Sequence, residues 1–204
     1  MTPNAVWTME GNILFPTPVF SFKLQDYQAL NQQLLETIYQ LKETEKGAMR
    51  TSAPLGWQSE TNLFSLPQLQ GFKQLIDAAV LETAKAIGYG EVKMQADRCW
   101  ANVNPQYAGN VVHDHANCLF SGVYYVQTPP NSGNLTFHDP RNARVFMQPR
   151  VSSYTPYIAD AIDIEVQQGV IVIFPSWLKH GVAPNLSDSD RVSLSFNYIF
   201  VRPL

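Results

Sequence analysis

The chain has 204 residues, a formal net charge of -3 and a sequence pI near 5.8. This length suits one globular domain, and a composition of 45% hydrophobic and 15% charged residues argues against disorder. Because there is no basic excess, we expect neither a nucleic-acid partner nor attraction to an anionic membrane.

The N-terminal part is predicted to begin with an edge strand and a helix. Residues 13–24 are rich in strand formers, but Pro16 and Pro18 would be excluded from the centre of a sheet. Apolar residues then recur at helical spacing over 26–45, with Asp26 as the expected N-cap.

A polar segment punctuated by Gly and Pro follows at 46–66 and is predicted to be a loop. The next helical pattern covers 67–87, and Gly88 is expected to end it. Both helices are amphipathic, so we expect them to pack by their apolar faces against the outside of a sheet.

From about Glu91 onward, short strand-forming runs alternate with turns such as TPPNSG and DPRNA. Many short strands without intervening helices indicate an antiparallel sandwich or barrel, and a jelly roll (a double-stranded β-helix) fits best. The fold class is therefore mainly β, in a single domain (1–204) with an N-terminal strand and helices at about 13–90 and a jelly-roll core at about 91–204. The predicted strands are 91–104, 119–127, 133–138, 145–154, 162–166, 169–174 and 191–201.

All four histidines lie between positions 113 and 180. In an extended strand His113 and His115 face the same way, with Cα atoms roughly 6–7 Å apart, while Asp114 points away. His180 follows the buried run 169–174 and would come from a different strand end. Neutral imidazoles are common ligands of first-row divalent metals, so the pattern predicts a metal site of three histidines.

Carboxylates are alternative ligands at this site. The usual redox site of this kind has two histidines and one carboxylate, and Asp114 or Asp139 would supply one if the local backbone were not a regular strand. With His115 as the ligand, three neutral groups leave an Fe(II) centre at +2 rather than +1, which favours a dianionic chelator. His138 is expected behind the ligands or at the surface.

The last predicted strand has one polar face. Arg191, Ser193, Ser195 and Asn197 alternate with apolar residues, so they share a side of the strand. If this face of the sheet were exposed, the polar residues would simply contact solvent and would indicate no binding site. Inside a barrel, Arg191 would be a buried charge in need of an anion, and its planar guanidinium suits a carboxylate, with the Ser193 hydroxyl as a second donor.

Two further side chains are candidates for the same anion. Only one of the adjacent tyrosines in SGVYYV (121–126) can face inward, and its phenol would bind a carboxylate without adding charge. Asn102, in WANVN, is placed to reach a cosubstrate or substrate.

Together these residues resemble the 2-oxoglutarate/Fe(II)-dependent oxygenases of the double-stranded β-helix, especially the prolyl-hydroxylase-like branch. The matching motifs are H-x-H at 113–115 in place of the usual H-x-D, SGVYYV, FPSWLKH ending in His180, and R-V-S from Arg191. Their order is similar to that of a group of small oxygenases from bacteria and phages that carry H-x-H. The resemblance covers about 95–201.

The resemblance implies three cofactors or cosubstrates: Fe(II) on the three histidines, 2-oxoglutarate and O₂. The distant carboxylate of 2-oxoglutarate would lie on Arg191, Ser193 and Tyr125. Oxidative decarboxylation would then yield succinate and CO₂ and hydroxylate a C–H bond of an unknown small-molecule or peptide substrate. The chain departs from the family at His115, where a carboxylate is expected.

Two rival functions remain. A non-catalytic jelly-roll binding protein with a structural metal would need a fourth protein ligand. A cupin-type enzyme with three histidines would have no need of Arg191 and Ser193. In either oxygenase or cupin, loops at the barrel mouth would set specificity, and we expect these at 46–66, 105–112 and 139–160.

General features of the sequence lead to expectations about the cellular location and the oligomeric state of the protein. Cys99 and Cys118 form neither a close pair nor a zinc motif, as in reduced cytoplasmic proteins. We find no signal-peptide pattern and no apolar run near the roughly 20 residues that span a bilayer. We therefore expect a cytoplasmic protein, of a bacterium or a phage-infected host cell, and the Pro-flanked edge strand favours a homodimer.

Overall fold

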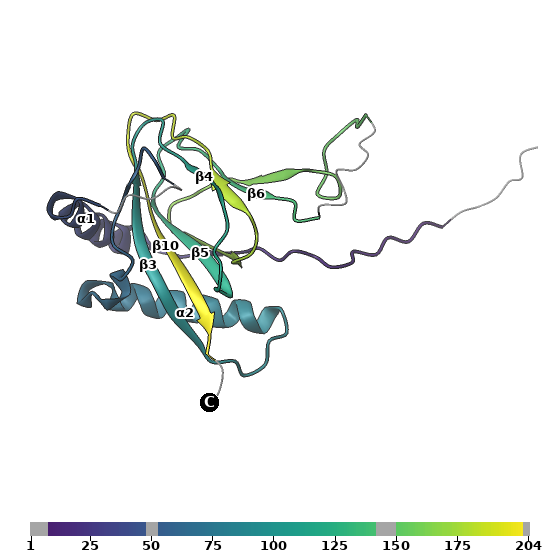
Figure 1. Cartoon of the computed structure of the whole chain (residues 1–204), viewed down its shortest axis with the longest axis horizontal. Helices are drawn as coiled ribbons and strands as arrows, with labels where there is room; N and C mark the ends of the chain where they lie inside the picture. Colours follow the sequence, from purple (N-terminus) through teal and green to yellow (C-terminus); the bar gives the residue numbers. More distant parts are fainter. Residues whose placement is uncertain (1–7, 48–52, 142–149, 202–204) are drawn as a thin grey trace, which may run out of the picture.

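The structure, a computed structural model, describes residues 8–47, 53–141 and 150–201. Two antiparallel sheets, of six and four strands, form the body of the protein, and two helices cover the larger sheet (Figure 1). The cavity described below is lined by residues of both sheets, so the sheets face each other. This confirms the prediction of a mainly β jelly roll with two helices on the outside.

The larger sheet has the strand order β1-β8-β5-β10-β3-β2, and the smaller has β4-β9-β6-β7. In the described part of the chain, neither helix is long and apolar enough to cross a membrane. The bounds are β1 (Phe20–Lys23), α1 (Gln28–Thr44), β2 (Trp57–Gln58), two short 3-10 helices (Leu63–Ser65 and Pro67–Leu69), α2 (Gln70–Ala86), β3 (Met94–Asn104), β4 (Asn110–His113), β5 (Phe120–Gln127), β6 (Leu135–His138), β7 (Ala161–Ile164), β8 (Val170–Pro175), β9 (His180–Val182) and β10 (Arg191–Phe200).

The larger sheet separates two hydrophobic clusters. On its outer face, Phe72 and Ile76 of α2 belong to one buried cluster with Leu194 and Phe196 of β10. On its inner face, a second cluster that includes Phe174 fills part of the space between the sheets. Because successive strand side chains point to opposite faces, the apolar residues of β10 face the helices and the polar ones face the interior.

Helix α1 is tied to the sheet by a buried asparagine. The Tyr124 hydroxyl donates to Asn31 Oδ1 at 2.5 Å, and Asn31 Nδ2 donates to the Val126 carbonyl at 2.7 Å. These bonds hold Tyr124 on the helix side of β5, so its neighbour Tyr125 points between the sheets.

Two local predictions about the N-terminal half are wrong. Helix α1 starts at Gln28, and Asp26 lies in the preceding turn with φ of 51°, so it does not cap the helix. The segment 46–66 contains β2, which pairs with β3 at the sheet edge. Strand β2 has only two residues, and its hydrogen-bond partners lie in a strand distant in sequence. No local sequence pattern therefore predicts it.

The strands that carry His113 and His180 were not among the predicted strand ranges, although His113 and His115 were expected on an extended strand and His180 at a strand end. Strand β4 lies partly in the expected loop 105–112, and β9 follows the predicted strand 169–174. Each has three or four residues and forms by pairing with the other. The predicted strand 145–154 lies largely outside the described residues, and its described part, 150–154, is irregular.

A glycine in β5 of the larger sheet allows close packing behind the cavity. A Cβ on Gly122 would collide with the Phe196 ring and lie 2.8 Å from the Val172 carbonyl oxygen. We expect Gly122→Ala to lower the free energy of unfolding in urea by about 1–3 kcal/mol, the usual cost of overpacking. The control is Gly71→Ala in α2, where no atom lies within 4 Å. Equal stability of the two variants would contradict this packing.

Candidate metal centre

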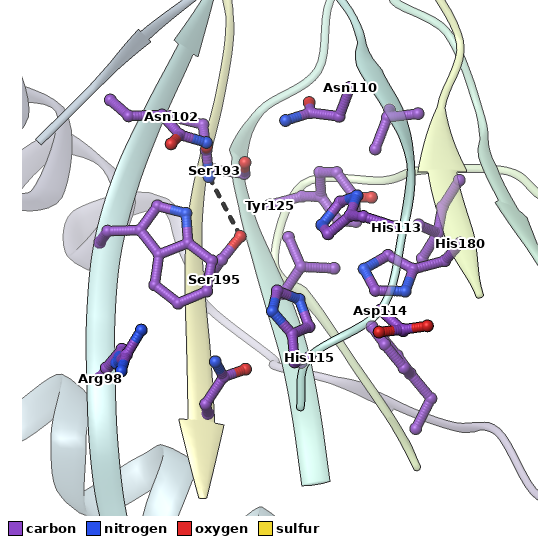
Figure 2. Close-up of a pocket in the computed structure, with 18 of the residues that line it drawn as sticks. Arg98, Asn102, Asn110, His113, Asp114, His115, Tyr125, His180, Ser193 and Ser195 are labelled. Atoms are coloured by element: carbon purple, nitrogen blue, oxygen red, sulfur yellow. Dashed lines mark hydrogen bonds between the residues drawn. The ribbon is translucent and has the colours of Figure 1, made fainter. Parts of the chain in front are cut away.

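Three histidines meet between the two sheets. His113 ends β4 and pairs directly with His180, the first residue of β9. His115 lies beyond the end of β4, and its backbone N–H donates to the Ser176 carbonyl at 2.9 Å. One nitrogen from each ring lies within 4.8 Å of the others. Figure 2 shows the three rings turned toward one another.

The backbone that carries His113 and His115 differs from the expected continuous strand. The prediction placed both on one face of an extended strand, whereas the strand ends at His113. The rings still approach, with centroids 5.0 Å apart, because the Ser176 carbonyl holds the backbone of His115 after the chain leaves the strand.

Backbone carbonyls orient two of the imidazoles. Nδ1 of His113 lies 2.7 Å from the Val111 carbonyl, and Nδ1 of His180 lies 2.9 Å from the Leu178 carbonyl. A carbonyl can only accept, so each Nδ1 carries the proton and each Nε2 presents a lone pair. This is the tautomer in which Nε2 binds a metal.

The imidazoles of His115 and His180 are also held neutral. Burial, with the charges of the neighbouring histidines, lowers the pKa of His180 to about 3, although its bond to the Leu178 carbonyl opposes the shift. Burial, together with the charges of His113 and Arg98, lowers the pKa of His115 to about 4. At neutral pH both rings are therefore uncharged and able to bind a metal.

The alternative ligands do not join this group. Among the described residues, the one cluster of possible metal ligands consists of the three histidines. Asp114 lines the cavity but is outside the cluster. Asp139 accepts hydrogen bonds from Nε and Nη2 of Arg141, at 2.9 and 2.8 Å, and it does not line the cavity. His138 does not line it either; its backbone N–H donates to the Lys179 carbonyl.

One end of the cavity contains two buried groups with unused hydrogen-bonding capacity. The Arg191 side chain is 1% exposed, and its Nη1 donates to the carbonyls of Ser132 and Ala183. Arg191 Nη2 and the Tyr125 hydroxyl are both buried without a partner among the described residues. Leaving such groups unpaired is costly, particularly for a cation, so this end of the cavity is built for an anion. Ser193 lies opposite Tyr125 in the strand register and lines the same space.

The other predicted polar residues form the cavity wall. Asn102 Nδ2 donates to Ser195 Oγ at 3.0 Å (dashed in Figure 2), and Asn102 Oδ1 accepts from Gln58 Nε2 at 2.6 Å. Asn197 Oδ1 accepts from Ser121 Oγ at 2.8 Å. These bonds fix the wall that faces the histidines.

Several lining residues were not predicted. Arg98 and Trp100 share the inner face of β3 with Asn102, and alternation along the predicted strand 91–104 could have revealed them. Gln58 and Asn110 come from short strands inside the expected loops, and nothing in the local sequence marks them.

The cavity has a volume of about 310 Å³. It is large enough for a small ligand beside the histidines, and this disfavours a closed structural metal site, which would need a fourth protein ligand. The end of the cavity that contains Arg191 and Tyr125 disfavours a cupin-type site, in which Arg191 would have no function.

Comparisons with known proteins agree with this geometry. Residues 98–197 match a family model described as "Putative 2OG-Fe(II) oxygenase". Among curated proteins, no sequence matches the chain.

Solved structures support the fold. A prolyl-4-hydroxylase from Pseudomonas putida is 17% identical, with a TM-score of 0.65 over 92% of this chain and 94% of that one. A prolyl hydroxylase from Trichoplax adhaerens is 12% identical, with a TM-score of 0.63 over 89% and 82%. HygX from Streptomyces hygroscopicus, solved with nickel, 2-oxoglutarate and hygromycin B, is also 12% identical, with a TM-score of 0.61 over 89% and 82%.

Proposed function

We propose that the protein, whose residues 98–197 match the 2OG-Fe(II) oxygenase model, couples decarboxylation of 2-oxoglutarate to the oxidation of a substrate C–H bond. His113, His115 and His180 would hold Fe(II) through ring nitrogens. Three neutral ligands on one side of the ion leave positions for a chelating cosubstrate and O₂.

One observation carries the proposal: the cavity of the three histidines also contains the unpaired Arg191 Nη2 and Tyr125 hydroxyl. A dianion that chelates the metal at one end would satisfy both groups with its distant carboxylate. The guanidinium would bind it with charge-assisted hydrogen bonds, and Ser193 and Tyr125 would add neutral donors.

Fe(II) held by the three histidines, with 2-oxoglutarate and O₂, would supply the redox chemistry: 2-oxoglutarate would lose CO₂ and become succinate, one atom of O₂ would enter succinate, and the other would enter the C–H bond as a hydroxyl. The protein positions these reactants. Apolar side chains of Val123, Leu135 and Phe174 line the same cavity and limit the entry of water. The dianion also offsets the +2 charge that three neutral ligands leave on the ion.

Binding of 2-oxoglutarate to the Ni(II)-loaded protein, measured by calorimetry, tests the proposal, with succinate release under Fe(II) and air as its companion. A wild-type protein that binds no 2-oxoglutarate would refute it. Tyr125→Phe should weaken binding roughly fivefold, the worth of one neutral hydrogen bond, without lowering the free energy of unfolding, because this hydroxyl has no partner in the part of the chain that the structure describes.

Tyr124→Phe is the matched control for this measurement. It removes the bond to Asn31 on the other face of the same strand, so it should lower the free energy of unfolding by about 1 kcal/mol and leave 2-oxoglutarate affinity unchanged. If both variants lowered the affinity for 2-oxoglutarate to the same extent, the assignment of Tyr125 to the binding site would be contradicted.

We also propose that the protein works in the cytoplasm as a homodimer. The free thiols of Cys99 and Cys118 support the location. The position of β1 at the edge of the larger sheet supports the assembly. A monomeric mass of 22.9 kDa in light scattering would overturn the dimer.

A further inference from the structure

The cavity has a second guanidinium, at the end away from the proposed cosubstrate site. In the ladder between β3 and β10, Arg191 pairs with Asn104 and Asn197 pairs with Arg98. These positions are six residues apart along β10, or about 20 Å of strand. Figure 2 shows Arg98 at the opposite end from Asn102 and Ser193, on the side where His115 lies. The proposed function gives Arg98 no role.

Arg98 is paired through one nitrogen with its sequence neighbour Asp97. Its Nε lies 3.1 Å from Asp97 Oδ2, and its side chain is 61% exposed while lining the cavity. No hydrogen bond from its two terminal nitrogens is present within the described part of the chain, and its ion pair with Asp97 is made through Nε. These nitrogens are the two parallel donors that a carboxylate accepts side by side.

The neighbouring wall suits the rest of an organic anion. Trp100 lies two residues further along the same face of β3, and its ring centroid is 5.8 Å from that of His115. The Oδ1 of Asn197 is taken by Ser121, so its amide N–H groups remain as donors beside Arg98. The Trp100 ring therefore offers an apolar aromatic surface close to His115 and on the same strand face as Arg98.

The charges on this wall select for the sign of a ligand. Asp114 is the one carboxylate among the residues that line the cavity, and no ion pair joins it to Arg98. Asp97, whose carboxylate pairs with the Nε of Arg98, does not line the cavity. A ligand that reaches from the histidines to this end therefore meets a positive group.

We propose that the substrate is a small carboxylate: its anionic group binds Arg98, its carbon skeleton lies against Trp100, and the C–H bond to be oxidised lies at the metal. This inference rests on the proposed function and names the substrate class of the same site. Because about 310 Å³ must also hold 2-oxoglutarate, the remaining space admits a small acid or a single acidic side chain.

The test compares two probes of equal shape, 3-phenylpropionate and 3-phenylpropionamide, by calorimetry with full-length protein loaded with Ni(II) and saturated with 2-oxoglutarate. We expect the acid to bind the wild type about fivefold more tightly than the amide, as befits a partly exposed ion pair. Arg98→Gln should remove that preference and leave 2-oxoglutarate affinity unchanged.

Arg141→Gln is the matched control, because Arg141 is 55% exposed, is also bonded to an aspartate near it in sequence, and does not line the cavity. It should keep the preference for the acid. Equal binding of the two probes, no measurable binding of either, or a preference that survives Arg98→Gln overturns the inference. Failure of the preceding 2-oxoglutarate titration refutes the proposed function instead, so the two failures are distinct.

A second pair of probes identifies the source of the carboxylate. Acetyl-Gly-Glu-Gly-amide and its Gln counterpart present the same chemistry on a peptide. Tighter binding of the Glu peptide that also depends on Arg98 indicates an acidic side chain of a peptide as substrate. A preference restricted to phenylpropionate indicates a free organic acid.

Discussion

Replacing His180 with alanine is expected to abolish metal binding. His180 has a fixed Nδ1 proton, a buried neutral ring and a direct cross-strand partner in His113. Removal of a residue that only orients a ligand already costs roughly 10–100-fold in metal affinity, so loss of the ligand itself should cost at least about 100-fold. Equilibrium dialysis with Co(II) or anaerobic Fe(II) measures the change.

His138→Ala is the matched control, since His138 is a histidine of the same sheet that does not line the cavity. It should bind metal like the wild type. The His180 ring also packs 4.6 Å from the Phe174 ring, so circular dichroism must show that His180→Ala is folded. A folded variant with full metal occupancy would show that the three histidines are not the metal site.

Arg191→Met should weaken 2-oxoglutarate by roughly 2–5 kcal/mol, the loss expected when a buried charge pair loses one partner. The reason is the unpaired Nη2, which is buried in the same cavity as Tyr125. Calorimetry with Ni(II)-loaded protein measures this loss. Metal affinity in the absence of 2-oxoglutarate should be unchanged, because Arg191 is not in the metal-ligand cluster.

Arg191→Lys separates charge from geometry. Lysine keeps the positive charge but lacks the planar pair of donors, so we expect affinity between those of the wild type and the Met variant. The Met variant without ligand should be about as stable as the wild type, because replacing a buried charge with an apolar side chain of similar size is often neutral. Unchanged 2-oxoglutarate affinity in both variants would contradict the proposed role of Arg191.

Elements with strong local patterns could be predicted from the sequence. The helices α1 and α2 repeat apolar residues at helical spacing, and both lie where the pattern places them. Strands β5, β8 and β10 are long enough for their composition to identify them. The weak points were the ends, as at Asp26, because capping depends on backbone geometry that composition does not determine.

The sequence was enough to predict which residues form the candidate site, but not the backbone arrangement that orients them. A stripe of alternating polar residues is a property of one strand, so Arg191 and Ser193 could be found without knowing any partner strand. The inward orientation of Tyr125 follows in the structure from the bond of Tyr124 to Asn31, which joins residues 93 positions apart. No local pattern contains such a bond.

By itself, the sequence determined the mainly β class, the two amphipathic helices, the group of three histidines and the polar face of the last strand. Each of these depends on side-chain identity and short-range periodicity. Only the tertiary structure decided that β4 and β9 pair, that His115 is held by the carbonyl of Ser176, and that Gln58 and Asn110 reach the same cavity. Those features depend on hydrogen bonds between distant segments. Such bonds form only once the sheets have brought the segments together.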